Sequence, residues 1–361
     1  MAHDEGRIEF TVVKFLGNSY IKALIWTVIL GFPYLIVLNI TGDVSKLPYD
    51  PNRFWLISYF LYALMAMAII WLNRVLNETR MNLLIRVPKE NHDKLMNIIR
   101  YCFKNPLEKV FIILSLAAGL FITSPYFYEI FGLRHPLVAA GASQITIIIF
   151  IFPQGLLYLF MFMLIYYALV TLIFLIVFSI LIARKKIKIL ISIYHPDERG
   201  GLKFLADTAF RMAVSLFIIL LWLANTTYYG YIIRTGEEAL LWLQYRLMTI
   251  IAVSIGIFIL FFVPLLAFRE IVTSTKLEEL NRIQHILEEM YFKIRGITDI
   301  KEISDMPERM VFQIFIIDRL YESIKRIREY PFDTAILAKL FTIGVAPILS
   351  IVLRVYLGIP I

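Results

Sequence analysis

The chain has 361 residues, of which 60% are hydrophobic and 18% charged, and a formal net charge of +8. Its mean hydropathy of +0.74 is above the range of soluble globular proteins. The excess cations stand beside apolar segments, where the positive-inside rule accounts for them, so we expect no nucleic-acid partner. The single cysteine, Cys102, excludes an internal disulfide and a cysteine-based metal cluster.

Apolar segments of about 20 residues, the length that crosses a bilayer as a helix, recur along the chain. They predict an all-α, polytopic transmembrane helical bundle of about seven spans. In chain order these are Tyr20–Ile40, Phe54–Leu76, Val110–Phe131, Pro153–Ala183, Met212–Ile233, Leu247–Phe268 and Ile336–Leu357. The polar N-terminal stretch, residues 1–14, lacks the apolar core of a signal peptide.

The connecting segments differ in their content of cations. Two are rich in them: Arg80, Arg86, Lys89, Lys94, Arg100, Lys104 and Lys109 follow the second span, and Arg184, Lys185, Lys186, Lys188, Arg199, Lys203 and Arg211 follow the fourth. The alternate connections carry few: Lys46, Arg53, Arg134 and Arg234. Because cytoplasmic loops carry the excess of Lys and Arg, the pattern predicts a multi-pass protein of the cell membrane with a cytoplasmic N-terminus and an external C-terminus.

No charged residue occurs between Pro136 and Ala183, a run longer than one crossing requires. Two interpretations stay open. Residues 137–152 form a re-entrant or peripheral half-helix that folds back at Pro153 and Gly155, or the whole run is one long kinked helix that projects beyond the bilayer.

Two segments assigned to the cytoplasm have helical periodicity. Residues 89–104 place Leu95, Ile99 and Phe103 on one face, which predicts a helix at the membrane interface. Residues 269–335 carry apolar residues at alternating spacings of three and four, which is typical of a coiled-coil seam. The seam includes Leu280, Leu287, Met290, Ile314, Ile317 and Tyr321. It predicts either a hairpin that packs on itself or a surface that packs against another subunit.

These boundaries divide the chain into a membrane domain (1–268, with cytoplasmic loops 77–109 and 184–211), a cytoplasmic helical hairpin (269–335) and a final span (336–361). None of the proposed spans has an acidic residue in its middle, so a proton relay finds no support. Uncharged polar residues at membrane depth are the candidates for a pore or substrate path: Gln154, Asn225, Thr226, Thr227 and Tyr228.

The most distinctive short motif runs from Tyr194 to Leu202 and contains His195, Asp197, Gly200 and Gly201. Proline and glycine indicate a turn between two helices, which is the simplest interpretation. The loop also resembles the His-Pro-Asp loop of J-domain co-chaperones, although membrane spans stand where the flanking helices of a J-domain would be. More broadly, the chain resembles a family of uncharacterised prokaryotic multi-pass membrane proteins with an HPDxxGGL cytoplasmic loop, and that resemblance implies no activity.

Three functional hypotheses follow. The first is a homo-oligomeric ion channel or pore, since coupling carboxylates are absent and a coiled coil can gather subunits. The second is a carrier for a small molecule, and the third is a scaffold or sensor whose His195–Asp197 loop recruits a cytosolic protein. No nucleophile–base pair or metal-ligand set can be assembled, so we expect neither an enzyme nor a cofactor. Abundant Ile, Lys and Glu are typical of a thermophilic prokaryote.

Overall fold

The computed structural model describes residues 8–43, 51–103, 107–130, 135–139, 141–184, 202–234, 236–294 and 308–327, together with residues 187, 189 and a few isolated positions between 338 and 353. All regular structure in this part of the chain is helical. The helices are α1 (Thr11–Leu16), α2 (Tyr20–Ile40), α3 (Pro51–Arg86), the 3-10 turn η2 (Lys89–Asn91), α4 (His92–Phe103), α5 (Leu107–Thr123), α6 (Pro125–Ile130), α7 (Pro136–Ala139), α8 (Gln144–Ala183), α9 (Lys203–Ile233), α10 (Gly236–Ile294) and α12 (Glu308–Lys325).

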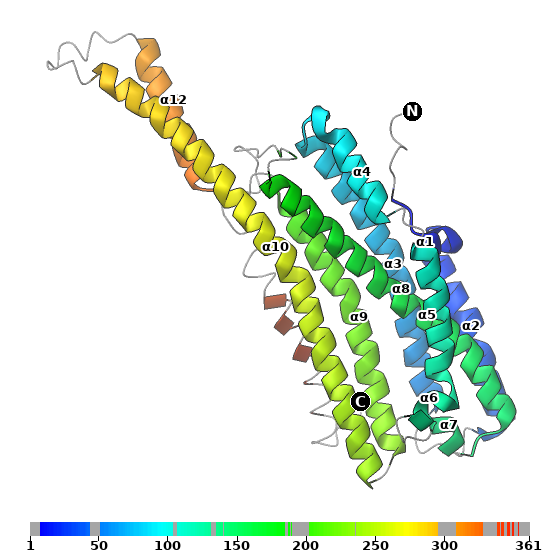
Figure 1. The fold of residues 1–361 in the computed structure, drawn as a ribbon. Helices are drawn as coiled ribbons and strands as arrows, with labels where there is room; N and C mark the ends of the chain where they lie inside the picture. Colours follow the sequence, from blue (N-terminus) through cyan, green and yellow to red (C-terminus); the bar gives the residue numbers. More distant parts are fainter. Residues whose placement is uncertain are drawn as a thin grey trace.

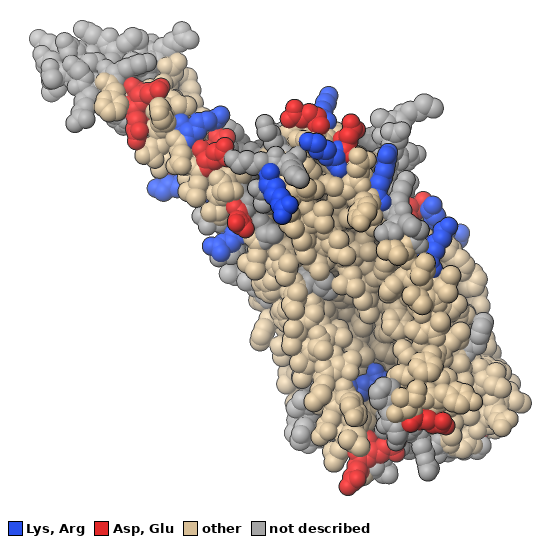
Figure 2. All heavy atoms as spheres, viewed as in Figure 1, with Lys and Arg blue, Asp and Glu red and all other residues tan. Residues whose placement is uncertain are grey.

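The long helices lie side by side in one bundle, and the distal half of α10 projects beyond it (Figure 1). We call the end that holds α4 the α4 end and the opposite end, with α6 and α7, the α6 end. Six helical segments of the described residues are long and apolar enough to cross a membrane. On the face in Figure 2, charged side chains gather at both ends of the bundle and on the projecting part. The apolar band between them identifies a multi-pass membrane protein.

The expected spans agree with the observed helices to different extents. The first coincides with α2, whereas α3, α8 and α9 each extend ten or so residues further at one end. The third span is broken at Ser124 into α5 and α6. The expected seventh span, residues 336–361, lies almost wholly outside the described residues and stays a prediction.

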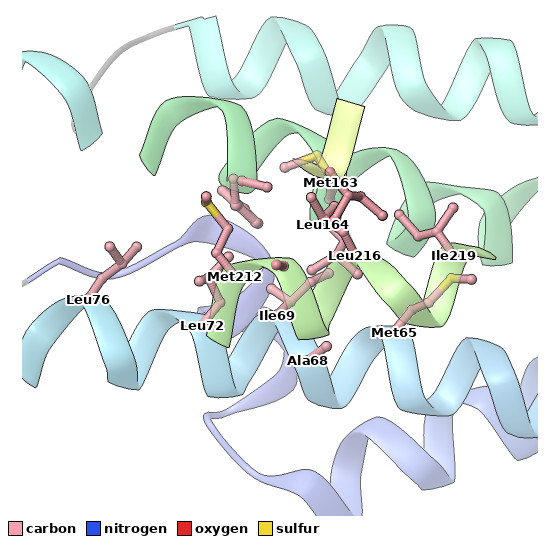
Figure 3. Packing of buried hydrophobic residues seen from close by; sticks show 14 of the residues in the cluster. Met65, Ala68, Ile69, Leu72, Leu76, Met163, Leu164, Met212, Leu216 and Ile219 are labelled. Atoms are coloured by element: carbon pink, nitrogen blue, oxygen red, sulfur yellow. The ribbon is translucent and has the colours of Figure 1, made fainter. Parts of the chain in front are cut away.

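The core of the bundle lies between α3, α8 and α9. Figure 3 shows Met65, Ile69 and Leu72 of α3 facing Met163 and Leu164 of α8, with side chains of α9 completing the contact. The α9 residues are Met212, Leu216 and Ile219. Met65, Met163 and Met212 are fully buried. Flexible methionine side chains fill the irregular space where three helices meet, so the middle of the bundle is packed.

Helix α8 decides between the two interpretations of the uncharged run. It continues from Gln144 to Ala183 with Pro153 inside it, so the chain does not fold back at residues 152–155. The single long helix holds for residues 144–183 only, since residues 136–139 form the separate helix α7. The glycine serves helix packing instead: a Cβ on Gly119 of α5 would lie 2.5 Å from the carbonyl oxygen of Gly155. Small residues allow two membrane helices to approach closely, which explains this Gly155 without a turn.

Residues 77–103, expected as part of a loop, are largely helical. Helix α3 runs on to Arg86, and α4 follows after the short turn η2. The apolar face expected for α4 is present, because Leu95, Ile99 and Phe103 are buried. This face packs against the protein rather than lying on a lipid surface, since the ring of Phe103 is 5.5 Å from that of Phe174 in α8.

The projecting part is an antiparallel pair formed by the end of α10 and α12 (Figure 1). The seam residues Leu280 and Leu287 of α10, and Ile317 and Tyr321 of α12, are partly buried and pack against the core cluster. At its base the ammonium group of Lys276 donates a hydrogen bond to the carbonyl of Ile327 at 2.9 Å. Helix α10 passes from bundle to hairpin without a break, so the expected boundary at residue 269 is no structural discontinuity. Met290 and Ile314, also half-buried, continue the seam toward the tip.

Five apolar residues of the N-terminal segment 8–16 are buried at the α4 end, which its mixed composition did not indicate: Ile8, Phe10, Val12, Val13 and Leu16. The ring of Phe10 stacks on that of Tyr167 with centroids 3.7 Å apart. The side chain of Asn77 exchanges hydrogen bonds with the backbone of Ile8, at 3.0 and 2.7 Å. The carboxylate of Glu108 accepts from both the backbone N–H and the hydroxyl of Thr11, each at 2.8 Å. These contacts wedge the segment between α3, α5 and α8.

Candidate functional site

A cavity of about 70 Å³ opens at the α6 end of the bundle. Seven helices (α3, α5, α6, α7, α8, α9 and α10), the segment before α7 and the residue after α9 contribute to its wall. The lining residues are Phe54, Trp55, Thr123, Tyr128, His135, Leu137, Phe150, Gln154, Tyr158, Trp222, Thr226, Tyr229, Gly230, Arg234, Trp242 and Arg246. A buried water needs roughly 10–15 Å³ on this scale, so the space accommodates about five waters or one small solute.

The outer part of the cavity is basic. The guanidinium of Arg234 lies over the indole ring of Trp242, 4.1 Å from its centroid, and that of Arg246 lies 4.3 Å from the same point. Such cation–π contacts stabilise charge at partly desolvated positions. Arg234 also donates to the carbonyl of Gly230 at 2.7 Å, and its Nε lies 3.4 Å from a carboxylate oxygen of Glu238. Burial lowers the pKa of Arg234, and repulsion by Arg246 adds to the effect.

The ring of Trp242 is fixed between α9 and α10. Its indole N–H donates to the carbonyl of Thr227 at 3.2 Å. A Cβ on Gly230 would lie 2.3 Å from that indole nitrogen, so only glycine leaves room for the ring. The ring of Tyr128 stacks against it at 6.5 Å. The position of both arginines therefore depends on a single aromatic side chain.

Deeper in the cavity the polar groups are neutral and buried. The amide nitrogen of Gln154 donates to the hydroxyl of Tyr62 at 2.8 Å. In the described part of the chain, the amide oxygen of Gln154, the indole nitrogen of Trp55 and Nδ1 of His135 have no hydrogen-bond partner. Buried polar atoms without partners are uncommon in native proteins and indicate a bound water or ligand.

The floor of the cavity is aromatic. Trp222 lies twelve residues before Arg234, which corresponds to a depth of about 18 Å along α9. Its ring contacts those of Tyr62 and Tyr158 at 5.7 and 5.2 Å. Beyond this layer begins the packed core, so the cavity is closed toward the α4 end.

The burial of His135 leads to a pH-dependent prediction. Desolvation lowers its pKa from 6.5 to about 4, and the positive charge of Arg234 acts in the same direction. The unfolded chain therefore binds a proton that the folded protein does not, and thermal stability should fall as the pH drops from about 6.5 to about 4. The His135→Gln variant, which does not titrate, should show a shallower fall in Tm across this window in detergent. Identical pH profiles for the two proteins would contradict the assignment.

Of the five residues expected to line a pore or substrate path, the structure places some at the cavity and others away from it. Gln154 and Thr226 line the cavity. Asn225 is buried away from it and donates to the hydroxyl of Ser58 in α3 at 3.2 Å, and the hydroxyl of Thr227 donates to the carbonyl of Leu223 at 2.6 Å. Tyr228 is half-buried. The loop motif with His195, Asp197, Gly200 and Gly201 lies outside the described residues.

Sequence reasoning missed the basic part of the site. Arg234 was expected only as a cation of a connecting segment, and Arg246 directly precedes the expected span Leu247–Phe268. Within α10, Glu238, Trp242 and Arg246 recur at intervals of four residues, which places their side chains on one helical face, and Arg234 lies just before this helix. That repeat at the start of an apolar span was the available signal.

No protein-family model, curated protein or solved structure matches the chain. Within the described residues, no three His, Cys, Asp or Glu side chains are grouped closely enough to hold a metal ion.

Proposed function

We propose that this multi-pass membrane protein is a carrier for a small solute, which binds in the cavity at the α6 end. The observation that carries the proposal is a cavity that opens at the α6 end, bears unpartnered buried polar atoms and ends at a packed core. A carrier needs a binding site that is open toward one side and closed toward the other. The solute undergoes no covalent change in this proposal.

The closed side is the α4 end, where the wedge of residues 8–16 fills the space between α3, α5 and α8. The described cations of both basic segments, among them Arg86, Arg100, Arg184 and Lys203, also lie toward this end, so the positive-inside rule assigns it to the cytoplasm and the cavity to the exterior. In this orientation the described conformation is open to the outside. Transport then requires that the wedge and the methionine-rich core separate while the cavity closes.

The test is counterflow in liposomes containing the purified full-length protein. A carrier gives saturable uptake that is accelerated by the same solute on the opposite side, and it gives no steady current in planar bilayers. Continuous ion conductance without saturation would overturn the carrier and favour a channel.

A homo-oligomeric channel is the second candidate, favoured by the outer face of the hairpin. Phe312, Phe315 and Ile316 of α12 are each exposed there, although such side chains are usually buried. A second copy packed on this face would gather subunits, and the pore would then lie between them. The scaffold hypothesis, with a cytosolic partner on the His195–Asp197 loop, stays a prediction.

A further inference from the structure

We propose that the cavity binds a small anion, an inorganic oxyanion or a short carboxylate, beside Arg234 and Arg246. That the protein also transports this anion rests on the proposed function. The binding site itself is argued from the charges and the size of the cavity.

The charge balance of the cavity favours an anion. Among the described residues, two arginines line it and no carboxylate does. Glu238, outside the lining, lies close to Arg234, and within the described residues no carboxylate pairs with Arg246. A partly buried guanidinium without an acidic partner loses hydration that a bound anion would replace. Because both guanidinium groups lie over the same indole ring, an anion beside that ring also reduces the repulsion between them.

The neutral groups complete a site for an oxyanion. The N–H of Trp55 is a buried donor without a partner, available to an oxygen of a bound oxyanion. His135 stays uncharged near neutral pH, since its pKa is lowered to about 4. The positive charge therefore comes from the arginines and is constant across the physiological range.

The size of the cavity limits the ligand. Its 70 Å³, room for about five waters on this scale, accommodates a small ion such as phosphate, sulfate or acetate. In Figure 2 a basic side chain is visible in a hollow of the apolar surface near the α6 end, which is the approach such an ion would take.

The test measures Tm of the purified full-length protein in neutral detergent, with sodium phosphate, sulfate or acetate added at constant ionic strength. The balancing salt is sodium gluconate, whose anion exceeds the cavity. We expect a saturable rise in Tm with at least one small anion. The Arg246→Gln variant should weaken the apparent affinity at least tenfold, since a charge-assisted hydrogen bond is lost.

The matched control is Arg74→Gln. Arg74 also stacks on an aromatic ring, that of Tyr20 at 4.6 Å, but it is exposed and far from the cavity. Its removal should leave the anion effect unchanged. A rise in Tm that does not saturate, or that is equal in all three proteins, is a general salt effect and would overturn the site.

The outcomes separate this inference from the proposed function. Counterflow of a neutral or cationic solute without any anion effect on Tm would retain the carrier and reject the anion. A saturable anion effect with no counterflow would retain the anion site and reject the carrier. Comparison of acetate with phosphate and sulfate distinguishes carboxylates from inorganic oxyanions.

Discussion

Replacement of Glu108 by alanine is expected to release the N-terminal wedge and to lower the stability of the whole bundle. The carboxylate accepts three hydrogen bonds, two from Thr11 at 2.8 Å and one from the hydroxyl of Tyr167 at 2.7 Å. Hydrogen bonds to a charged group contribute about 1.5–3 kcal/mol each, but Glu108 is only half-buried and water replaces part of them in the variant. The combined loss should therefore be on the order of 3 kcal/mol, below the plain sum. Hydrogen exchange of residues 8–16 should become much faster, and Tm should fall by several degrees.

Three variants make this prediction specific. Glu108→Gln keeps an acceptor oxygen and should lie between the wild type and alanine. Tyr167→Phe removes one donor of the three and should have a smaller effect. Glu90→Ala removes an exposed carboxylate at the same end of the bundle and should change neither measurement. Unchanged exchange of residues 8–16 in Glu108→Ala would show that the carboxylate does not hold the wedge.

The wedge also shows where the sequence was a poor guide. Residues 8–16 mix apolar and charged types without the length of a span, and their burial depends on Asn73, Asn77 and Glu108 from distant positions. Hydropathy identified α2 to the residue because an isolated apolar run between polar neighbours has only one interpretation. It underestimated the lengths of α3 and α10, because both helices continue beyond their apolar runs into segments that contain charged residues.

The Pro153–Gly155 segment left two interpretations open for a physical reason. In a soluble protein these residues together indicate a turn, whereas helices in a membrane tolerate proline and use glycine for close packing. The hydroxyl of Thr123 donates to the carbonyl of Ile151, so a neighbouring helix satisfies backbone beside the proline. Such a partner cannot be read from a single segment.

The candidate site was only partly predictable for a similar reason. Gln154 and Thr226 were found because a polar residue in an apolar span is visible by itself. The basic outer part of the cavity forms only where the end of α9, the start of α10 and the α6 region converge, and such convergence is a property of the tertiary structure. Only the four-residue spacing of Glu238, Trp242 and Arg246 within α10 is encoded locally.

Trp242 is the residue on which this convergence depends, and its replacement should have the largest effect on the site. Trp242→Leu removes the hydrogen bond to Thr227, the stacking with Tyr128 and the surface under both arginines. Truncation of a buried aromatic side chain costs about 3–5 kcal/mol, and leucine, which retains part of the volume, should cost about 2–3 kcal/mol. The stabilisation of the protein by small anions should disappear.

A graded series separates packing from the placement of charge. Trp242→Phe retains an aromatic face but no N–H, so it should keep a weakened anion effect while losing about 1 kcal/mol from the hydrogen bond. Trp26→Leu is the control at the α4 end, where Trp26 is half-buried against Phe15 at 5.0 Å. It should lower Tm modestly and leave the anion effect intact. If Trp242→Leu still bound anions with wild-type affinity, the indole ring would not be what positions Arg234 and Arg246. The backbones of α9 and α10 would then have to fix both arginines by themselves.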